Sequence, residues 1–391
     1  MYTMLSDVGE LMCWDREGMA PGLRNHVIAF STVALTDQVT RLAASKVPGT
    51  LALTPQFERG IRGADAGLQQ RAIEAIVNHP NVGAALIVTH DRVAAEELLE
   101  RFSSLSKPVA VIALMAENGL DAALQSMTRQ LGLLLAQTAG AMRRPMQAAE
   151  LTVALECGGS DASSSVCANP AIGRFVDRLV AAGGTAIVSE TAEFLGGEEV
   201  VRHQSTTAAV ADEILHCMAR VEALMLESGE DYRGVNPTQE NIEAGLTTLT
   251  EKTMGALCKI GNSSFSGCLA FGEAPTGAGL FFMDTPFFSP TSLSGMALGG
   301  AQISLFAIGV FNPSGMPLMP VLKVCGNPAT VDMWKDGIDL DVTGLIDGRY
   351  TLEQAADQLS ETLCRVGNGE LTATERRNEG QLIVPRTIAA L

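Results

Sequence analysis

The middle of the chain carries the stretch that decides its fold, Leu151-Thr152-Val153-Ala154-Leu155-Glu156-Cys157-Gly158-Gly159-Ser160-Asp161. An apolar strand ends there at a carboxylate and a thiol, and a glycine-rich turn follows at once. In open parallel sheets, ligands bind outside the carboxyl ends of the strands, where paired glycines let a ligand approach backbone N–H groups. The stretch therefore predicts a parallel sheet with a polar site after this strand.

Short apolar runs alternate with amphipathic stretches along the chain, which predicts an α/β fold of mainly parallel sheets with flanking helices. We expect strands at 27–34, 50–53, 84–89, 108–114, 151–155, 185–189, 280–283, 303–308 and 320–324. We expect helices at 91–105, 120–141, 169–182, 207–227, 239–259 and 351–366, with Asn169 capping the third. The polar segment 143–149 contains a proline, and we place a domain boundary there. It separates an N-terminal Rossmann-like domain, 1–145, from a C-terminal α/β catalytic domain, 146–391.

Composition excludes several classes of protein. The formal net charge of -17 is opposite to the basic footprint of a nucleic-acid-binding protein. No apolar run reaches the roughly 18 residues needed to cross a bilayer, and the first residues are acidic where a secretory signal would be basic. We therefore expect a cytoplasmic protein with neither nucleic acid nor membrane as partner.

Several familiar site motifs are absent from the sequence. The eight cysteines are scattered without a C-x-x-C pair, so neither a zinc knuckle nor a disulfide framework is indicated. There is no G-x-G-x-x-G after a strand, no phosphate-binding loop and no G-x-S-x-G elbow. These absences argue against a common dinucleotide fold, a P-loop enzyme and an α/β-hydrolase.

Acidic residues follow three predicted strands: Glu156, Glu190 and Asp284. Carboxylates at one sheet edge suit a divalent metal or a division of acid and base roles. Each of these acidic segments also has a purely structural explanation. After Glu156, Ser160 or Asp161 can cap the next segment while Cys157 is buried. After Glu190, a helix dipole can favour Glu193, and Asp284 begins an Asp-Thr-Pro sequence that is common in turns.

An acidic protein that binds an acidic substrate must concentrate its few cations locally. Arg24 offers a fork donor for a carboxylate, His26 an imidazole and Lys252 an ammonium on a helix. For Lys252 the alternative is a solvated helix face. His90 ends another predicted strand, where it could bind a metal.

Together, these motifs resemble the altronate/galactarate dehydratase family over nearly the whole chain. The matching runs are Glu156-Cys157-Gly158-Gly159-Ser160-Asp161, Ala168-Asn169-Pro170, Ser189-Glu190-Thr191, Gly245-Leu246-Thr247-Thr248 and Phe282-Met283-Asp284-Thr285-Pro286. Within that family, Leu23-Arg24-Asn25-His26-Val27 and Gly326-Asn327-Pro328 most resemble the large subunit of sulfolactate sulfo-lyase.

The resemblance implies a lyase that uses ferrous iron or another divalent metal, and a separate small subunit as partner. It also suggests that the C-terminal domain has a knotted α/β fold. We expect the protein to form a homo-oligomer. We expect catalytic roles for Glu156, Glu190, Lys252 and Asp284. The substrate-binding residues expected are Arg24, His26, Ser160, Asp161, Asn169, Thr247 and Thr248, and the metal ligands expected are Cys157 and His90.

The expected reaction is β-elimination from a small anionic 2-hydroxy acid, with 3-sulfolactate giving pyruvate and sulfite. Because the proton at C2 is weakly acidic, the reaction needs a Lewis acid and a base within roughly 3 Å of that proton. The alternatives are a sugar-acid dehydratase and a non-catalytic scaffold subunit. The scaffold is suggested by segments 54–60 and 89–91, where the chain departs from the family pattern, as it also does at 310–313.

Overall fold

A computed structural model of the chain describes residues 10–227, 229 and 236–387. These residues form two compact units. The larger unit comprises residues 146–380 and those before Met12, and the smaller unit comprises residues 12–145 and those after Gly380. No helix in the described part of the chain is long and apolar enough to cross a membrane.

The smaller unit is built on a four-stranded parallel sheet of order β3-β2-β4-β5. Its helices and strands are β1 (Met12–Trp14), β2 (His26–Ser31), α1 (Asp37–Ser45), β3 (Thr50–Leu53), α2 (Gly63–Asn78), β4 (Val82–Thr89), α3 (Arg92–Phe102), β5 (Val109–Ala113), α4 (Leu120–Thr138) and β6 (Arg143–Pro145). β1 and β6 pair separately, in antiparallel orientation.

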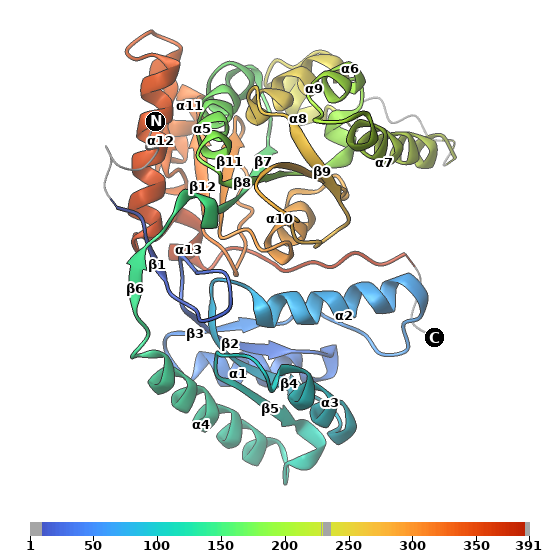
Figure 1. Cartoon of the computed structure of the whole chain (residues 1–391), viewed down its shortest axis with the longest axis vertical. Helices are drawn as coiled ribbons and strands as arrows, with labels where there is room; N and C mark the ends of the chain where they lie inside the picture. The colour runs from blue at the N-terminus through green and yellow to red at the C-terminus, as the bar shows by residue number, and fades with distance from the viewer. Residues whose placement is uncertain (1–9, 228, 230–235, 388–391) are drawn as a thin grey trace. The chain divides into compact units, whose positions relative to one another are not determined.

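Helices cover both faces of this sheet. Alternate residues of β2, Val27 and Ala29, pack with α1 and α4 in one apolar cluster. The residues between them, Ile28 and Phe30, are equally buried. Figure 1 shows α2 on the other side of the sheet from α4. Strands covered on both faces read as continuous apolar runs, which explains why the sequence predicted them well.

The larger unit contains a seven-stranded parallel sheet of order β13-β12-β11-β7-β8-β10-β9. Its strands are β7 (Thr152–Gly158), β8 (Thr185–Val188), β9 (Phe265–Leu269), β10 (Gly279–Met283), β11 (Ile303–Ile308), β12 (Val321–Cys325) and β13 (Leu340–Asp341). Its helices are α5 (Asn169–Ala181), α6 (Glu198–His203), α7 (Ala208–Glu227), α8 (Gln239–Glu243), α9 (Leu249–Leu257), α10 (Ser289–Leu298), α11 (Pro328–Met333), α12 (Leu352–Gly367) and α13 (Ala373–Arg377).

The strand that opens the larger unit, β7, lies in the middle of its sheet, between β11 and β8. The chain first builds β8, β9 and β10 on one side of β7, and then β11, β12 and β13 on the other. The carboxyl end of β7 is therefore flanked by turns that are far apart in the sequence. The α/β class with two parallel sheets and flanking helices is confirmed.

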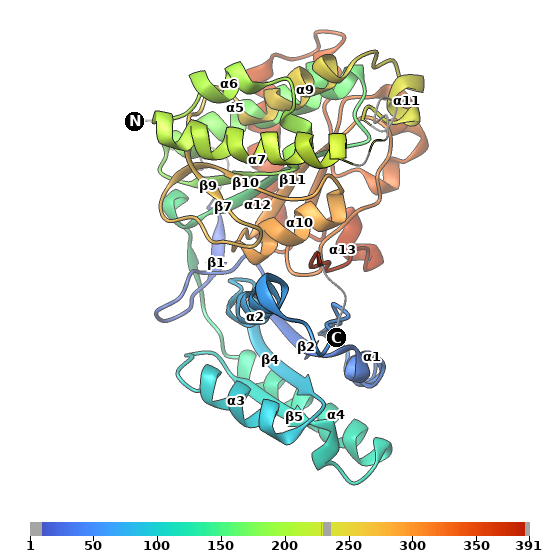
Figure 2. The ribbon, with the colours of Figure 1, turned by 90° about the vertical axis from the view of Figure 1, so that its right-hand side faces the viewer.

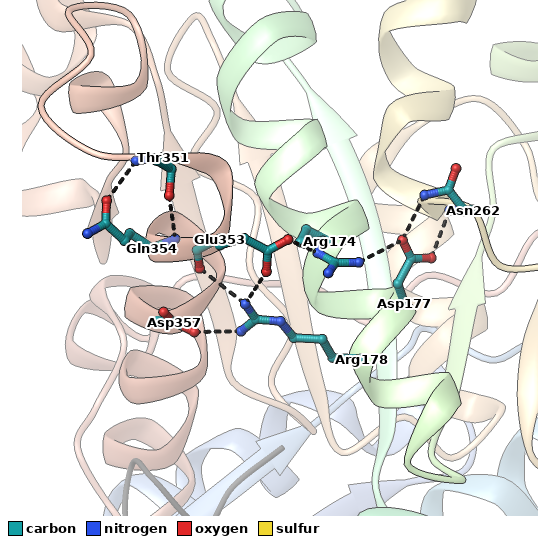
Figure 3. Close-up of polar contacts among 8 residues, drawn as sticks. All are labelled: Arg174, Asp177, Arg178, Asn262, Thr351, Glu353, Gln354 and Asp357. Carbon is teal, nitrogen blue, oxygen red and sulfur yellow. Dashed lines mark hydrogen bonds and ion pairs between the residues drawn. The ribbon is translucent and has the colours of Figure 1, made fainter. Parts of the chain in front are cut away.

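Surface ion pairs join α5 to α12 on the outside of the larger unit (Figure 3). Arg178 donates to Asp357 Oδ1 at 2.6 Å and to Glu353, which also accepts from Arg174. The helix that carries these acids begins with a reciprocal cap, because Thr351 Oγ1 accepts from Gln354 N and the Gln354 amide accepts from Thr351 N. All four of these ion-paired side chains are at least a quarter exposed, so solvent screens the pairs.

Two local predictions were wrong. The helix expected at 239–259 is split into α8 and α9, because Gly245 adopts a φ of 101° and Thr248 starts a new helix by accepting from Glu251 N at 3.1 Å. Asn169 does not cap α5. A π-helical turn at Ser164–Ala168 runs directly into the helix, so Asn169 is its first helical residue and its amide is free to bond elsewhere.

Candidate active site

Three buried glutamates lie at the carboxyl end of the central strands of the larger unit. Glu156 is in β7, Glu190 follows the neighbouring strand β8, and Glu193 lies in the one-turn helix Thr191–Phe194. Each side chain is at most 3% exposed. Burial of an ionised carboxylate is costly unless cations or hydrogen bonds compensate. Three such carboxylates in one place therefore indicate a functional site rather than residues that only stabilise the fold.

Glu156 is held from the buried helix α10. Its Oε2 accepts from Ser292 Oγ, which is also hydrogen-bonded to Ser189 Oγ. Its Oε1 has no hydrogen-bond partner among the described residues. Burial raises the pKa of Glu156 to about 7, although the bond from Ser292 and the charge of Lys259 lower it. A carboxyl group with such a pKa exchanges its proton near neutral pH, as a general base must.

Glu190 has a left-handed backbone, with φ 67° and ψ 75°. Its N–H donates to Thr285 Oγ1 at 2.9 Å, and the next N–H, of Thr191, donates to Thr285 O at 3.2 Å. The turn after β10 thus holds Glu190 in a conformation that costs a non-glycine residue on the order of 1–3 kcal/mol. Burial, followed by the charges of Glu156 and Glu193, raises the pKa of Glu190 well above its ordinary value.

Two lysines supply positive charge to the cluster. Lys259 is fully buried and forms an ion pair with Glu193. Burial alone would lower the pKa of Lys259, but the charges of Glu193, Cys157 and Glu156 outweigh it and raise that pKa. Lys252 Nζ donates to Asn236 Oδ1 at 2.8 Å and lies 4.4 Å from the centre of the Phe287 ring.

Lys252 also interacts electrostatically with a carboxylate of the cluster. Its charge lowers the pKa of Glu190, against the larger effect of burial. Its side chain is 5% exposed, so the solvated helix face considered as an alternative is wrong.

Ser160 and Asn169 both contact the sulfur of Cys157, which lies in β7 next to Glu156 in the sequence. Cys157 Sγ lies 3.2 Å from Ser160 Oγ and accepts from Asn169 Nδ2 at 3.4 Å. The same amide nitrogen donates to Gly255 O at 3.0 Å, while Asn169 Oδ1 has no partner among the described residues. Burial raises the pKa of Cys157 to about 11.

Three predicted substrate-binding residues make hydrogen bonds with residues close to them in the chain. Asp161 Oδ1 accepts from Ser164 N at 2.8 Å, and its Oδ2 accepts from Asn327 at 2.6 Å. Thr248 caps α9, and Thr247 donates to Glu251 at 2.6 Å on the exposed side of that helix. These contacts correspond to the capping alternative for Asp161, and none of the three is brought to the buried carboxylates.

Asp284 lies next to the cluster but its carboxylate points elsewhere. Oδ1 accepts from Thr191 Oγ1 at 2.7 Å, and Oδ2 forms an ion pair with Arg220 of α7 at 2.5 Å. The side chain is a quarter exposed. Asp284 therefore supports the turn that contains Glu190, and the structure does not join its carboxylate to Glu156.

Arg24, His26 and His90 all belong to the smaller unit. Arg24 is buried, with Nη1 donating to Leu23 O at 3.2 Å, and it precedes β2. His26 is the first residue of β2, so both lie at the amino end of that sheet. His90 directly follows β4, at the carboxyl end.

A cavity of about 310 Å³ opens at that carboxyl end, between α2 and α3. Its lining includes Thr32 after β2 and Thr89 at the end of β4, which is where the strand order reverses. Arg59 and Asp91 face each other across its rim at 3.0 Å. The two N-terminal segments that we expected to depart from the family pattern, 54–60 and 89–91, thus both line this cavity.

The placement of the described side chains shows whether they could hold a metal ion by themselves. Among the described residues, no three His, Cys, Asp or Glu side chains are placed to hold a metal ion together. These residues do not form a complete ligand set, and ferrous iron remains a prediction.

Three members of the cluster were missed from the sequence: Glu193, Lys259 and Ser292. Lys259 and Ser292 become neighbours of Glu156 only through folding, since they are more than a hundred residues away from it. One signal was available. α10 contains three serines among its first six residues, yet nine of its ten residues are buried, and buried hydroxyls need polar partners.

Models of two family domains match the chain. The C-terminal domain of D-galactarate/altronate dehydratase matches residues 148–390, and the second domain of D-galactarate dehydratase/altronate hydrolase matches residues 13–139.

Whole proteins give the same result. The chain is 31% identical to the (2R)-sulfolactate sulfo-lyase subunit beta of Chromohalobacter salexigens, covering 95% of this chain and 96% of that one. It is 24% identical to altronate dehydratase of Escherichia coli, over 96% of this chain and 77% of the relative. It is 30% identical to galactarate dehydratase (L-threo-forming) of the same organism, over 58% of this chain and 43% of the relative. The chain belongs to the D-galactarate/altronate dehydratase family.

Proposed function

We propose that the chain is the large subunit of a lyase that performs β-elimination on a small anionic 2-hydroxy acid, with 3-sulfolactate as its substrate. The observation that carries the proposal is the pairing of two buried, mutually repelling carboxylates, Glu156 and Glu190, with two buried lysines. The relative with 31% identity, named a sulfolactate sulfo-lyase subunit, supports the choice of substrate.

Glu156 is the proposed base. Its ionised carboxylate takes the proton from C2 of the substrate, the C3–S bond breaks, and sulfite leaves as the C2–C3 double bond forms. The enol then takes a proton at C3, loses the proton of its hydroxyl group and becomes pyruvate. Oε1 of Glu156, which has no protein partner in the described part of the chain, is the atom assigned to this proton.

The lysines are assigned to the charges of substrate and transition state. Lys259, kept protonated by Glu193, balances negative charge near Glu156. Lys252 is assigned to an anionic group of the substrate. Fixed cations in a buried site stabilise developing negative charge far more than they would in water.

The proposal includes ferrous iron and a separate small subunit. When bound, the iron would supply a Lewis acid for the substrate carboxylate and hydroxyl. The relative's name, subunit beta, supports a partner subunit for this chain.

A sugar-acid dehydratase is the second candidate, favoured by the similarity to altronate and galactarate dehydratases. Both candidates are tested by one experiment. The chain is purified anaerobically, combined with its small subunit and ferrous iron, and offered 3-sulfolactate, altronate and galactarate. Sulfite and pyruvate from 3-sulfolactate alone support the proposal. A 2-oxo acid from a sugar acid alone selects the dehydratase, and no product from any substrate contradicts both.

A further inference from the structure

Two cysteines of the larger unit lie side by side outside the carboxylate cluster. Cys217 is on α7 and Cys268 is in β9, 51 residues away in the sequence, and their Sγ atoms are 3.9 Å apart. α7 packs directly against β9 (Figure 2). Both thiols are free, and both are only partly buried.

We propose that Cys217 and Cys268 form a redox-active dithiol, a modification site that small disulfides of the glutathione class oxidise to an intramolecular disulfide. The sulfurs of a disulfide are about 2.05 Å apart, so these two must approach by about 1.9 Å. A change of one side-chain rotamer moves a sulfur by at least this order of distance. Because the helix and the strand are already packed together, neither has to refold.

Cys217 is the attacking thiol. Its hydrogen bond with Cys268 lowers its pKa, and the charge of Arg220, one helical turn further along α7, acts in the same direction against burial and Asp284. The same contact and burial raise the pKa of Cys268. Thiolates rather than thiols attack disulfides. Cys217 therefore reacts first with the small disulfide, and Cys268 attacks Cys217 afterwards.

The remaining cysteines are worse placed for this reaction. Five are buried: Cys13, Cys157, Cys167, Cys325 and Cys364. Cys258 is exposed, but its thiol donates to Met254 O at 3.3 Å and burial of its sulfur raises its pKa. Cys258 is therefore a suitable control for accessibility.

The reaction is thiol–disulfide exchange. The Cys217 thiolate attacks one sulfur of oxidised glutathione, which releases one glutathione thiolate and leaves a mixed disulfide on Cys217. Cys268 then loses its proton and attacks the Cys217 sulfur, which releases the second glutathione. Two protein thiols are oxidised and one small disulfide is reduced to two thiols.

The disulfide would tie α7 to the edge of the sheet beside the Arg220–Asp284 ion pair. Arg220 lies on α7, and Asp284 follows β10, the strand next to β9. We therefore expect oxidation to raise the urea midpoint of unfolding and to slow proteolysis of α7.

The test uses the full chain, reduced and then treated with oxidised glutathione, followed by thiol counting and peptide mapping. We expect the wild type and Cys258→Ser to lose two thiols and to give a peptide pair joined through Cys217 and Cys268, reversed by dithiothreitol. Cys217→Ser and Cys268→Ser should not give this pair, and Cys268→Ser should keep one glutathione on Cys217.

Failure would be equally clear. If the wild-type map contains no Cys217–Cys268 pair while Cys258 carries glutathione, the dithiol does not exist. The wild-type map decides this even if a serine variant fails to fold. No step depends on lyase activity, so the result is independent of the proposed function.

Discussion

At the scale of single residues, the most informative side chain is Glu156. Its burial gives it a pKa of about 7, and one of its oxygens has no partner in the described structure. A structural carboxylate in such a position would normally be fully hydrogen-bonded, as Asp161 is with Ser164 and Asn327. The contrast between the two acids explains why we assign chemistry to one and capping to the other.

Replacement of Glu156 by glutamine should remove the base while keeping the size of the side chain and its bond to Ser292. We expect kcat for the lyase reaction to fall by roughly 10²–10⁴-fold, the usual contribution of a general base. Glu353→Gln, which alters an exposed acid of α12, is the matched control and should leave kcat unchanged. Equal activity of Glu156→Gln and wild type would remove Glu156 from the mechanism.

The raised pKa of Glu156 also predicts how stability depends on pH. The folded state holds this proton up to about pH 7, and the unfolded state only to about 4.5. The stability contributed by the protonated group is therefore complete below pH 4.5 and is lost as pH rises through 7. Tm values measured from pH 4.5 to 8 should fall more steeply for the wild type than for Glu156→Gln. Parallel curves for the two proteins would contradict the assignment.

At the scale of elements, buried and exposed ion pairs differ in how much the loss of one partner destabilises the protein. Lys259 follows α9 and pairs with Glu193 after β8, with both side chains 1% exposed. The pairs between α5 and α12 are exposed and screened (Figure 3). Loss of one partner from the buried pair leaves an uncompensated charge in the core, whereas the surface network loses little.

Lys259→Met should accordingly destabilise the protein by about 3–5 kcal/mol in urea unfolding, because the Glu193 carboxylate is left buried and unpaired. Replacing Glu193 by leucine in the same chain should restore a large part of that loss. Arg178→Met, on the surface network, should cost only about 0–1 kcal/mol. A cost for Lys259→Met as small as for Arg178→Met would show that the buried pair is not formed.

The turn after β7 gives a second prediction about elements. Gly159 has a φ of 64°, and a Cβ there would lie 2.1 Å from Val310 O in the segment that follows β11. Gly159→Ala should cost roughly 2–5 kcal/mol, from about 1–2 for the backbone and about 1–3 for crowding. Gly183 has a φ of 89°, but a Cβ there would lie 3.8 Å from Ala149 Cβ, an ordinary van der Waals contact, so Gly183→Ala should cost only the backbone part. Equal urea midpoints for the two variants would contradict this packing.

Most elements could be predicted because their sequence patterns are strong. Parallel strands such as β3 and β11 are mainly apolar runs, and their predicted bounds match the structure. The short edge strand β9 lacks such a run, since it reads Phe-Ser-Gly-Cys-Leu. The split between α8 and α9 was missed because the left-handed Gly245 interrupts an otherwise helical pattern.

From the sequence, the site could be predicted only for residues that lie at or just after the end of a strand. Glu156 and Glu190 follow or end apolar strands, so the sequence placed them at one sheet edge, and the pairing of β7 with β8 confirms that placement. Asp284 follows the next strand, but the sequence could not show that Arg220 would hold its carboxylate. Lys259 comes from a distant turn, and only the packed structure reveals its contact with Glu193.

At the scale of the whole molecule, the chain contains two α/β units, each with its own parallel sheet and its own polar carboxyl edge. The buried carboxylates belong to the larger unit, and the cavity rimmed by Arg59 and Asp91 belongs to the smaller. We propose the first as the place of catalysis.

The role of Glu156 and the choice of substrate can be tested together by one kinetic experiment. The wild-type chain and Glu156→Gln are each combined anaerobically with the small subunit and ferrous iron, and sulfite release from 3-sulfolactate is followed with time. We expect the wild type to release sulfite and pyruvate in equal amounts, and the variant to do so at a rate lower by at least about a hundredfold. No sulfite from the wild type, or the same rate from both proteins, would contradict this prediction.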